Sequence, residues 1–271
     1  MKRLLWFIPV LLLLTAAGKR EEGVYRMLVN DSFGAGETLT YRVHMGWLNA
    51  GEASMEIDNT THMVNGRPCY KIDVNGHTTG LADILYKVRD NWGSYLDTIS
   101  LIPQQSYRYI YEGSYRKFEI MNFDHSKDSV AVTPLDKQTM VPRKDKFFPT
   151  PDNVQDIVSG YYYIRLVDFN MIKKGDVINV DGFFDEEIYH FRVRFMGRET
   201  VDTKLGEVNA IVLSPIMDEN KLFDGESSIK IWLSDDENKI PLKVRAKMFV
   251  GAVEVDIKTA ENLRQPINYA D

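Results

Sequence analysis

The chain has 271 residues, of which 44% are hydrophobic, 27% charged and 11% aromatic. This composition is typical of a folded globular protein and excludes intrinsically disordered and collagen-like chains. The 33 basic and 39 acidic residues give a formal charge of −6, which argues against a broad nucleic-acid-binding surface, so we expect no nucleic-acid partner.

The N-terminus has the pattern of a secretory signal peptide. Two basic residues precede an apolar run from Leu4 to Leu14, and Thr15-Ala16-Ala17 offers small residues for cleavage. As a helix this run is about 16 Å long, roughly half of a bilayer core. We expect a signal peptide over residues 1–17 and an exported chain in the periplasm or cell envelope, soluble and without a transmembrane span after cleavage. A retained N-terminal anchor is the alternative.

Hydrophobic and polar side chains alternate with a period of two in many segments after residue 38, which indicates antiparallel strands with one buried and one solvated face. Strands and helices do not alternate along the chain, so a parallel sheet is excluded as the main architecture. Turn residues such as Asn65-Gly66 separate the segments and indicate hairpins. The clearest alternating segments are 39–45, 52–58, 189–195, 242–248 and 253–257.

Two segments have helical character instead. A short helical turn is expected at Leu81–Ile84. From Val154, apolar residues recur every three or four positions, and Asp152 followed by Gln155 resembles a capping box. We expect the principal helix over about 153–168, seated on the concave face of a curved sheet, where its apolar side is buried.

These elements predict a mainly β fold: a large curved antiparallel sheet or incomplete β-barrel with one principal α-helix against its concave face. We expect a single domain over residues 35–260, built from an N-terminal sheet (35–141), the helix and a C-terminal sheet (176–259). A linker at 18–34 precedes the domain, and a tail at 261–271 follows it.

Motifs for catalysis and metal binding are missing from the sequence. The five histidines lack the spacing of a zinc site, and neither a nucleophile elbow, a Walker A loop nor a dinucleotide fingerprint is present. We therefore expect no metal, no cofactor and no enzymatic activity. For the less favoured alternative, an envelope hydrolase, Asp90 and Asp185 are the first carboxylates to consider. Cys69 is the sole cysteine, so an intramolecular disulfide is excluded, and we expect it to be a half-buried structural residue.

Aromatic side chains are concentrated in the middle of the chain. Large rings with polar tips suit pockets that hold an apolar ligand, although the same rings can fill the interior of a wide barrel. By residue type and position, the candidate ligand-binding residues are Trp92, Tyr109, Tyr161, Tyr162 and Phe184.

Several short motifs are distributed over most of residues 35–258. They are Gly36–Tyr41, Ala50–Ala53, Arg89–Trp92, Tyr107–Glu112 with Tyr115, Asp156–Arg165, Trp232–Asp236, Ile240–Leu242 and Val250–Val253. Together they resemble the bacterial family called domain of unknown function 3108. The resemblance implies an exported, β-rich protein without an established activity, and it supplies no catalytic residues.

We therefore expect an exported, non-catalytic cell-envelope protein. Its ligand would be hydrophobic or amphipathic, such as a lipid or a lipid-linked envelope component, held in the cleft between helix and sheet. The alternative is an interaction or scaffold module with a filled core, whose partner would be an envelope protein. A continuous apolar cavity under the helix would favour the first hypothesis, and a filled interior would favour the second.

Overall fold

The computed structural model describes residues 25–216, 228–248 and 251–270, so the expected signal peptide over residues 1–17 lies outside them. The strands are β1 (Thr38–Met45), β2 (Leu48–Val64), β3 (Arg67–Thr78), β4 (Val88–Asp97), β5 (Pro103–Glu112), β6 (Tyr115–Asp124), β7 (Ser129–Pro134), β8 (Lys146–Pro149), β9 (Val177–Phe184), β10 (Glu187–Thr203), β11 (Gly206–Ile216), β12 (Ile229–Ser234), β13 (Pro241–Lys247) and β14 (Ala252–Glu261). The helices are α1 (Gly80–Leu85) and α2 (Ile157–Ile164).

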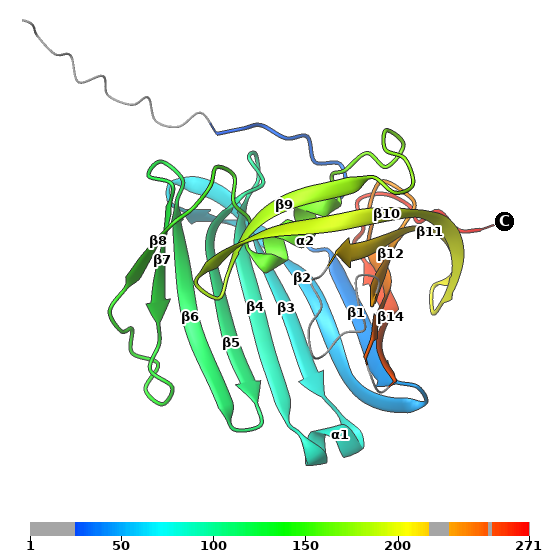
Figure 1. Ribbon diagram of the computed structural model, residues 1–271, viewed down its shortest axis with the longest axis horizontal. Coiled ribbons are helices and arrows are strands. Elements are labelled where there is room, and N and C mark those ends of the chain that lie inside the picture. The colour runs from blue at the N-terminus through cyan, green and yellow to red at the C-terminus, as the bar shows by residue number, and fades with distance from the viewer. Residues whose placement is uncertain (1–24, 217–227, 249–250, 271) are drawn as a thin grey trace, which may run out of the picture.

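In the part of the chain that the structure describes, the strands form one fourteen-stranded antiparallel sheet with the order β8-β7-β6-β5-β4-β3-β2-β1-β14-β13-β12-β11-β10-β9. The expected N-terminal and C-terminal sheets are therefore two halves of the same sheet, joined where β1 pairs with β14. The sheet is not closed, and β8 and β9 are its two edges. It curves so far that the hairpin β9–β10 crosses in front of the middle strands, with α2 behind it (Figure 1). The expected curved, incomplete barrel is confirmed.

The principal helix, α2, begins at an N-cap four residues later than the sequence pattern predicts. The Asp156 carboxylate accepts hydrogen bonds from the backbone N–H groups of Val158 (2.7 Å) and Ser159 (2.9 Å). The Ser159 hydroxyl in turn accepts one from the Asp156 N–H (2.9 Å), which completes a capping box. Asp156, rather than Asp152, therefore starts the helix, and the expected range of 153–168 is too long at both ends.

The residues before α2 are extended because β9 holds them. Gln155 forms a parallel bridge with Gly182. Its backbone N–H donates to the carbonyl of Asp181 (2.9 Å), and its carbonyl accepts from the N–H of Phe183 (2.8 Å). This pairing excludes Gln155 from the helix and fixes the start of α2 beside β9, on the concave side of the sheet.

The concave side around α2 is filled by two hydrophobic clusters. Val158 and Tyr162 project from the helix into the first, whose other buried members are Phe33, Ile57, Ile72, Leu96 and Leu101. Tyr161 and Ile164 pack against the second, which contains Phe169, Val193, Phe195, Ile211, Leu213 and Leu233. The helix is thus embedded in core and is not the lid of an empty chamber.

A buried ion pair ties the end of α2 to two distant segments. Arg165 directly follows the helix and Glu37 directly precedes β1, and both side chains are buried. The guanidinium donates to both carboxylate oxygens of Glu37, at 2.6 and 2.8 Å. It also donates to the carbonyl oxygens of Ser32 (3.0 Å) and Asn238 (2.8 Å). One side chain therefore joins the segment before β1, the helix and the loop between β12 and β13.

Neighbouring residues of β4 and β5 face opposite sides of the sheet, as the strand pleat requires. Trp92 packs against the cluster beneath α2, which marks the concave face. Its neighbour Asn91 donates to the Asp73 carboxylate (3.0 Å) across the convex face. Trp92 is paired with Arg108 and Asn91 with Tyr109, so Arg108 faces the concave side and Tyr109 the convex side.

Cys69, on β3, is fully buried, and burial raises the pKa of its thiol to about 12. Because the thiolate is the reactive species, we expect Cys69 to react with a chromogenic disulfide reagent at about pH 8 about a thousandfold more slowly than a free cysteine. Thiol titration of the native protein and of the protein in guanidinium checks this. Rapid labelling of the native chain would contradict it, and an introduced Leu85→Cys thiol, exposed on α1, serves as the reactive control.

Candidate functional site

A network of charged side chains lies on the concave face, where the β9–β10 turn meets β5 and β6. Arg108 is nearly fully buried, and its guanidinium contacts the carboxylates of Glu119 (2.5 Å) and Asp185 (2.7 Å). Lys117 also contacts Asp185, and its Nζ lies 3.7 Å from Glu119. The bonds from Lys117 and Arg108 hold the pKa of the Asp185 carboxyl below its usual value. Two cationic and two anionic side chains therefore lie together on the concave face.

An aromatic pair lies against this network. The rings of Trp92 on β4 and Phe184 at the end of β9 are stacked, with their centroids 6.0 Å apart and an interplanar angle of 27°. The Arg108 guanidinium carbon lies 5.4 Å from the first ring centroid and 5.1 Å from the second. A guanidinium over an aromatic face is attractive, so the two rings and the cation form one cluster.

The β9–β10 turn is held in place from both sides of its tip. Asp185 and Glu186 both have positive φ (52° and 70°), the backbone that a tight two-residue hairpin turn requires. Asp185 forms ion pairs with Arg108 and Lys117, and Glu186 forms one with Lys146 of β8 (2.7 Å). These contacts fix the free end of the hairpin against the opposite half of the sheet and keep Phe184 over Trp92.

Four of the five candidate ligand-binding residues lie near one another: Trp92 stacks on Phe184 and packs against the cluster that contains Tyr162, whose ring contacts that of Tyr161. Tyr162 is fully buried in the core, and Tyr161 lies between the two clusters with its hydroxyl 3.5 Å from the Lys239 carbonyl. Tyr109 lies on the convex face, where its ring contacts those of Tyr107 and Phe118.

The carboxylates considered for a hydrolase belong to separate networks. Asp185 is an ion-pair partner of two cations and has a lowered pKa. Asp90 accepts a hydrogen bond from the N–H of Tyr111 (3.0 Å), and burial raises the pKa of its carboxyl. Glu112 interacts with Asp90, and its own pKa is raised by partial burial and by that neighbouring charge. The geometry pairs Asp90 with Glu112 and not with Asp185.

The space between α2 and the aromatic pair is small. A gap of about 10 Å³, lined by Trp92, Arg108, Asp156 and Phe184 among others, has room for about one water molecule. A larger groove of about 430 Å³ lies on the convex face and is lined by Asn75, His77, Arg89, Asn91, Tyr109 and Tyr111. Among the described residues, the cavity under the helix is therefore filled.

Arg108, Lys117 and Glu119 are the members of this site that sequence reasoning missed. All three lie at alternating, concave-facing positions of β5 and β6, between aromatic or aliphatic residues that face the other way. A buried arginine in a strand paired with a carboxylate in the next strand is a detectable signal. Recognising this pair requires the register of the β5–β6 hairpin, which the sequence alone does not determine.

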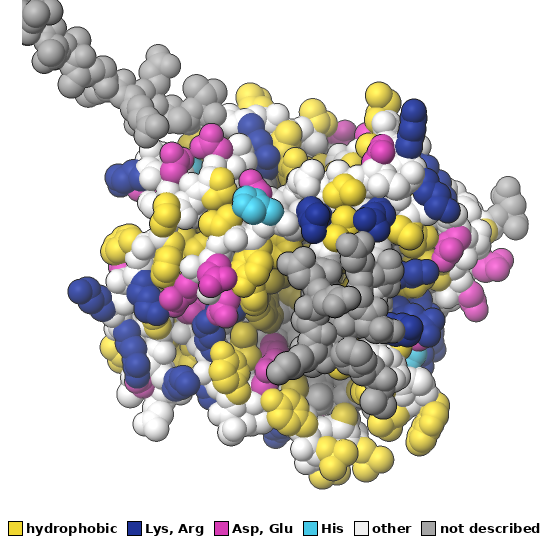
Figure 2. Space-filling model, in the orientation of Figure 1, with side chains coloured by type: hydrophobic (Ala, Val, Ile, Leu, Met, Phe, Trp, Pro, Cys, Tyr) yellow, Lys and Arg dark blue, Asp and Glu magenta, His cyan; other side chains and the backbone are white. Residues whose placement is uncertain are grey.

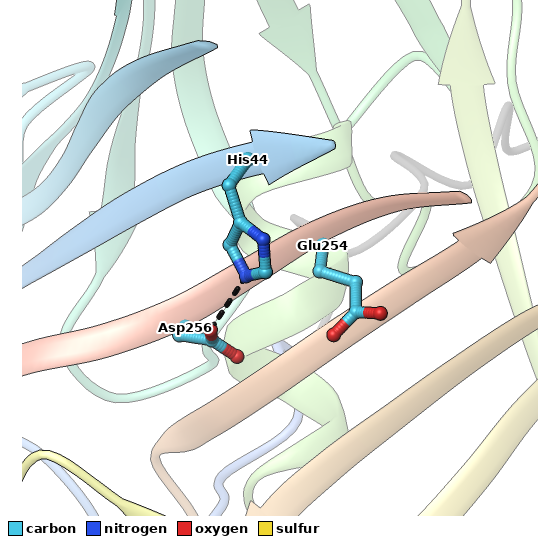
Figure 3. Close-up of side chains that lie close together, drawn as sticks. All are labelled: His44, Glu254 and Asp256. Carbon is cyan, nitrogen blue, oxygen red and sulfur yellow. Dashed lines mark hydrogen bonds and ion pairs between the residues drawn. The ribbon is translucent and has the colours of Figure 1, made fainter. Parts of the chain in front are cut away.

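A histidine and two carboxylates on the convex face have a geometry that could hold a metal ion. His44 on β1 and Glu254 and Asp256 on β14 place ligand atoms within 4.8 Å of one another. The imidazole points at Asp256, with Nε2 2.7 Å from the carboxylate (Figure 3). Its Nδ1 lies 2.8 Å from the carbonyl oxygen of Gly46, an orientation that metal-binding histidines also use.

The cations around this group argue against a metal. Lys243 lies 3.0 Å from the Glu254 carboxylate and 3.6 Å from that of Asp256. Arg42 contacts Asp256 (3.3 Å) and Arg245 contacts Glu254 (3.5 Å). Three cationic side chains already compensate the two carboxylates, so a divalent ion would meet net positive charge. We interpret the group as an ion-pair cluster that links β1, β13 and β14.

Comparisons with known proteins agree with the fold. The sequence matches the family described as "Protein of unknown function (DUF3108)" over residues 40–258. A β-barrel-like protein of the domain of unknown function DUF1849 from Brucella abortus superposes with a TM-score of 0.55 at 9% identity, covering 87% of this chain and 99% of that one. At this identity the likeness concerns the fold alone. No curated protein matches the sequence.

Two further solved structures are similar at a TM-score of 0.32 and 10% identity. One is described as an exported protein with a YmcC-like fold from Bacteroides fragilis, and the other as a lipoprotein from Parabacteroides distasonis. Each alignment covers 87% of this chain and 99% or 100% of the other. Neither helix among the described residues has the length and apolar character that crossing a membrane requires.

Proposed function

The chain belongs to the DUF3108 family of proteins of unknown function, and from that premise we propose that it is an exported, non-catalytic protein that binds an anionic amphiphile on the concave face of its sheet. The observation that carries the proposal is the stacked pair Trp92 and Phe184 beside the buried Arg108. An apolar surface next to a fixed cation suits a molecule with a hydrocarbon part and a negatively charged head group.

The apolar part of the ligand would lie on the concave face of the sheet, next to the hydrophobic cluster beneath α2. Met55, Val74 and Trp92 are half-buried hydrophobic side chains at the edge of the core, so part of their surface is available to a ligand. Covering such surface contributes about 25 cal/mol per Å² of apolar area removed from water. Phe184 extends this surface from the opposite side, because the β9–β10 hairpin holds it over Trp92.

The head group would take the place of Asp185. The Asp185 side chain is 51% exposed although it is paired with Arg108 and Lys117, whereas Arg108 and its other partner Glu119 are buried. A phosphate or carboxylate can accept the same charge-assisted hydrogen bonds from these two cations. Glu119 would stay in place and keep Arg108 neutralised, so Asp185 is the exchangeable partner.

We expect the Trp92→Ala variant to bind the fluorescent anionic amphiphile dansylundecanoate about tenfold more weakly than the wild type, since one large apolar contact is lost. Titration followed by dansyl emission measures the affinity. The matched control is Tyr109→Ala, which removes an aromatic ring from the adjacent strand but from the convex face. Its affinity is expected to be unchanged.

A second variant tests the head-group site without altering the apolar wall. Lys117→Gln is expected to reduce the preference for dansylundecanoate over an uncharged dansyl amide of equal chain length. Circular dichroism establishes that each variant is folded. Equal losses in the Trp92 and Tyr109 variants, or the absence of binding to the folded wild type, would overturn the proposal.

The filled space beside α2 argues against a ligand enclosed between helix and sheet, leaves the proposed amphiphile the half-buried surface of the concave face, and favours the scaffold alternative. In that case the exported protein would act through its surface on an envelope protein, and neither amphiphile would bind. Native mass spectrometry of the protein purified from its own envelope separates the two functions. A co-purifying lipid whose occupancy falls in the Trp92→Ala variant supports the ligand site, and an unliganded chain bound to another protein supports the scaffold.

A further inference from the structure

Three neighbouring turns form a continuous edge at one end of the sheet. The helix α1 lies in the connection between β3 and β4, and the N–H of Thr79 before it donates to the carbonyl of Ala50 at the start of β2 (3.0 Å). On the other side, the N–H of Gly113, in the β5–β6 turn, donates to the carbonyl of Lys87 (2.8 Å). Backbone hydrogen bonds thus hold the β1–β2 turn, α1 and the β5–β6 turn side by side.

This edge carries large hydrophobic side chains that the protein does not cover. Trp47 is 95% exposed in the β1–β2 turn, and α1 has no buried residue at all. We call this set the apolar rim: Trp47, Leu81, Ile84, Leu85, Tyr86 and Tyr115. Hydrophobic side chains are visible along the lower edge of the molecule in Figure 2, where Figure 1 places α1.

Packing within the protein does not explain the apolar side chains of α1, because none of them is buried. A six-residue helix is too short to be stable on its own, and most helices are stabilised by burying an apolar face. In α1 the residues that would form this face, Leu81, Ile84 and Leu85, are 65%, 81% and 84% exposed. The Tyr86 ring packs directly on Gly113, which keeps Tyr86 at the rim. A Cβ atom at position 113 would lie only 2.7 Å from that ring.

We propose that the apolar rim inserts into the interfacial layer of a lipid bilayer. Its composition is that of a membrane-contacting surface: one tryptophan and two tyrosines, which favour the interface, with leucine and isoleucine for the acyl region. Lys87 directly follows Tyr86, and Arg116 directly follows Tyr115, which places cations where lipid phosphates would lie. This inference is independent of the proposed ligand site.

The shape and charge of the rim favour a bilayer over a folded partner. The rim is a single edge made of three turns, whereas a stable protein interface needs a complementary surface of more than about 1,000 Å². The carboxylate of α1, Asp83, is neutralised by Arg89 at 2.7 Å and would not repel anionic lipid. The Nη1 group of Arg116 donates to the backbone carbonyls of Gly113 and Tyr115. These partners are uncharged and do not neutralise the guanidinium.

An environment-sensitive nitrobenzoxadiazole label tests the rim at a single position. The native thiol of Cys69 is buried, so a Leu85→Cys variant of the full chain is labelled at residue 85 alone. We expect its emission to rise several-fold and shift to the blue on vesicles of phosphatidylethanolamine and phosphatidylglycerol. The matched control is Met171→Cys, which is 80% exposed on the loop after α2 at the other end of the sheet, and its label should not respond.

Two further changes assign the effect to the rim. In the labelled chain, Trp47→Ala is expected to lower the partition coefficient about tenfold, the effect of losing one large inserted side chain. Lys87→Gln with Arg116→Gln is expected to lower it about fivefold per charge on anionic vesicles and not on phosphatidylcholine alone. Equal responses from residues 85 and 171, no response at 85, or a response at 85 that follows protein concentration without vesicles would overturn the proposal, the last indicating self-association.

Discussion

Replacing Arg165 with methionine is expected to lower the free energy of unfolding by about 3–5 kcal/mol. The side chain is completely buried, and its loss leaves the Glu37 carboxylate in the core without a counter-charge. The carbonyl oxygens of Ser32 and Asn238 lose a donor at the same time. Urea unfolding, followed by circular dichroism and tryptophan emission, measures the difference.

Two comparisons isolate the contribution of the buried pair. Arg198→Met removes an arginine that is 38% exposed and bonded to Asp235, and is expected to cost no more than about 1 kcal/mol. Combining Arg165→Met with Glu37→Leu is expected to recover much of the loss, because removing both charges leaves neither one unpaired. An Arg165→Met protein within about 1 kcal/mol of the wild type would show that the pair does not hold these segments together.

The strand pattern was predictable because it depends on local alternation. Residues such as Leu39 and Tyr41 are buried and Thr40 is not, as the period of two requires. That β1 would pair with β14, and so join both halves into one sheet, depends on contacts between residues more than two hundred positions apart. No local pattern encodes that pairing.

The start of α2 shows where local rules become ambiguous. Both Asp152 with Gln155 and Asp156 with Ser159 have the spacing of a capping box, and either could begin a helix. The structure decides between them through the bridge of Gln155 to Gly182, a contact with a strand that comes later in the chain. Helix propensity and capping patterns are local, so they do not include that contact.

The candidate site was predictable only in part, for a similar reason. Trp92 and Phe184 were expected as ligand-binding residues by type, and they meet because the β9–β10 hairpin crosses the sheet. Tyr109 has the same chemistry, but β5 carries large side chains on both faces, so hydrophobicity does not reveal which face is concave. The buried Arg108 identifies that face, and its burial is visible only in the folded chain.

The Asp156→Asn variant is expected to change how stability depends on pH. Burial raises the pKa of the Asp156 carboxyl to about 6, from an ordinary 3.8, although the Ser94 hydroxyl and two backbone N–H groups donate to it. Because this pKa is higher in the folded than in the unfolded chain, the native state binds more protons between these two values. Its contribution to stability therefore falls as pH rises, by about 3 kcal/mol in total from well below the lower value to well above the higher one.

Asparagine keeps the cap but cannot ionise, so the variant lacks this loss. Its side-chain oxygen can accept from the N–H groups of Val158 and Ser159, and asparagine is a favourable N-cap residue. We expect the stability of the variant relative to the wild type to rise by about 2.4 kcal/mol between pH 4 and pH 7, measured by urea unfolding at intervals across that range. Asp156→Ala, which removes the cap and the charge together, should show the same pH trend with an added loss of about 1 kcal/mol at every pH. Parallel curves for the wild type and the asparagine variant would mean that Asp156 stays ionised throughout, with its three hydrogen bonds outweighing the cost of burial.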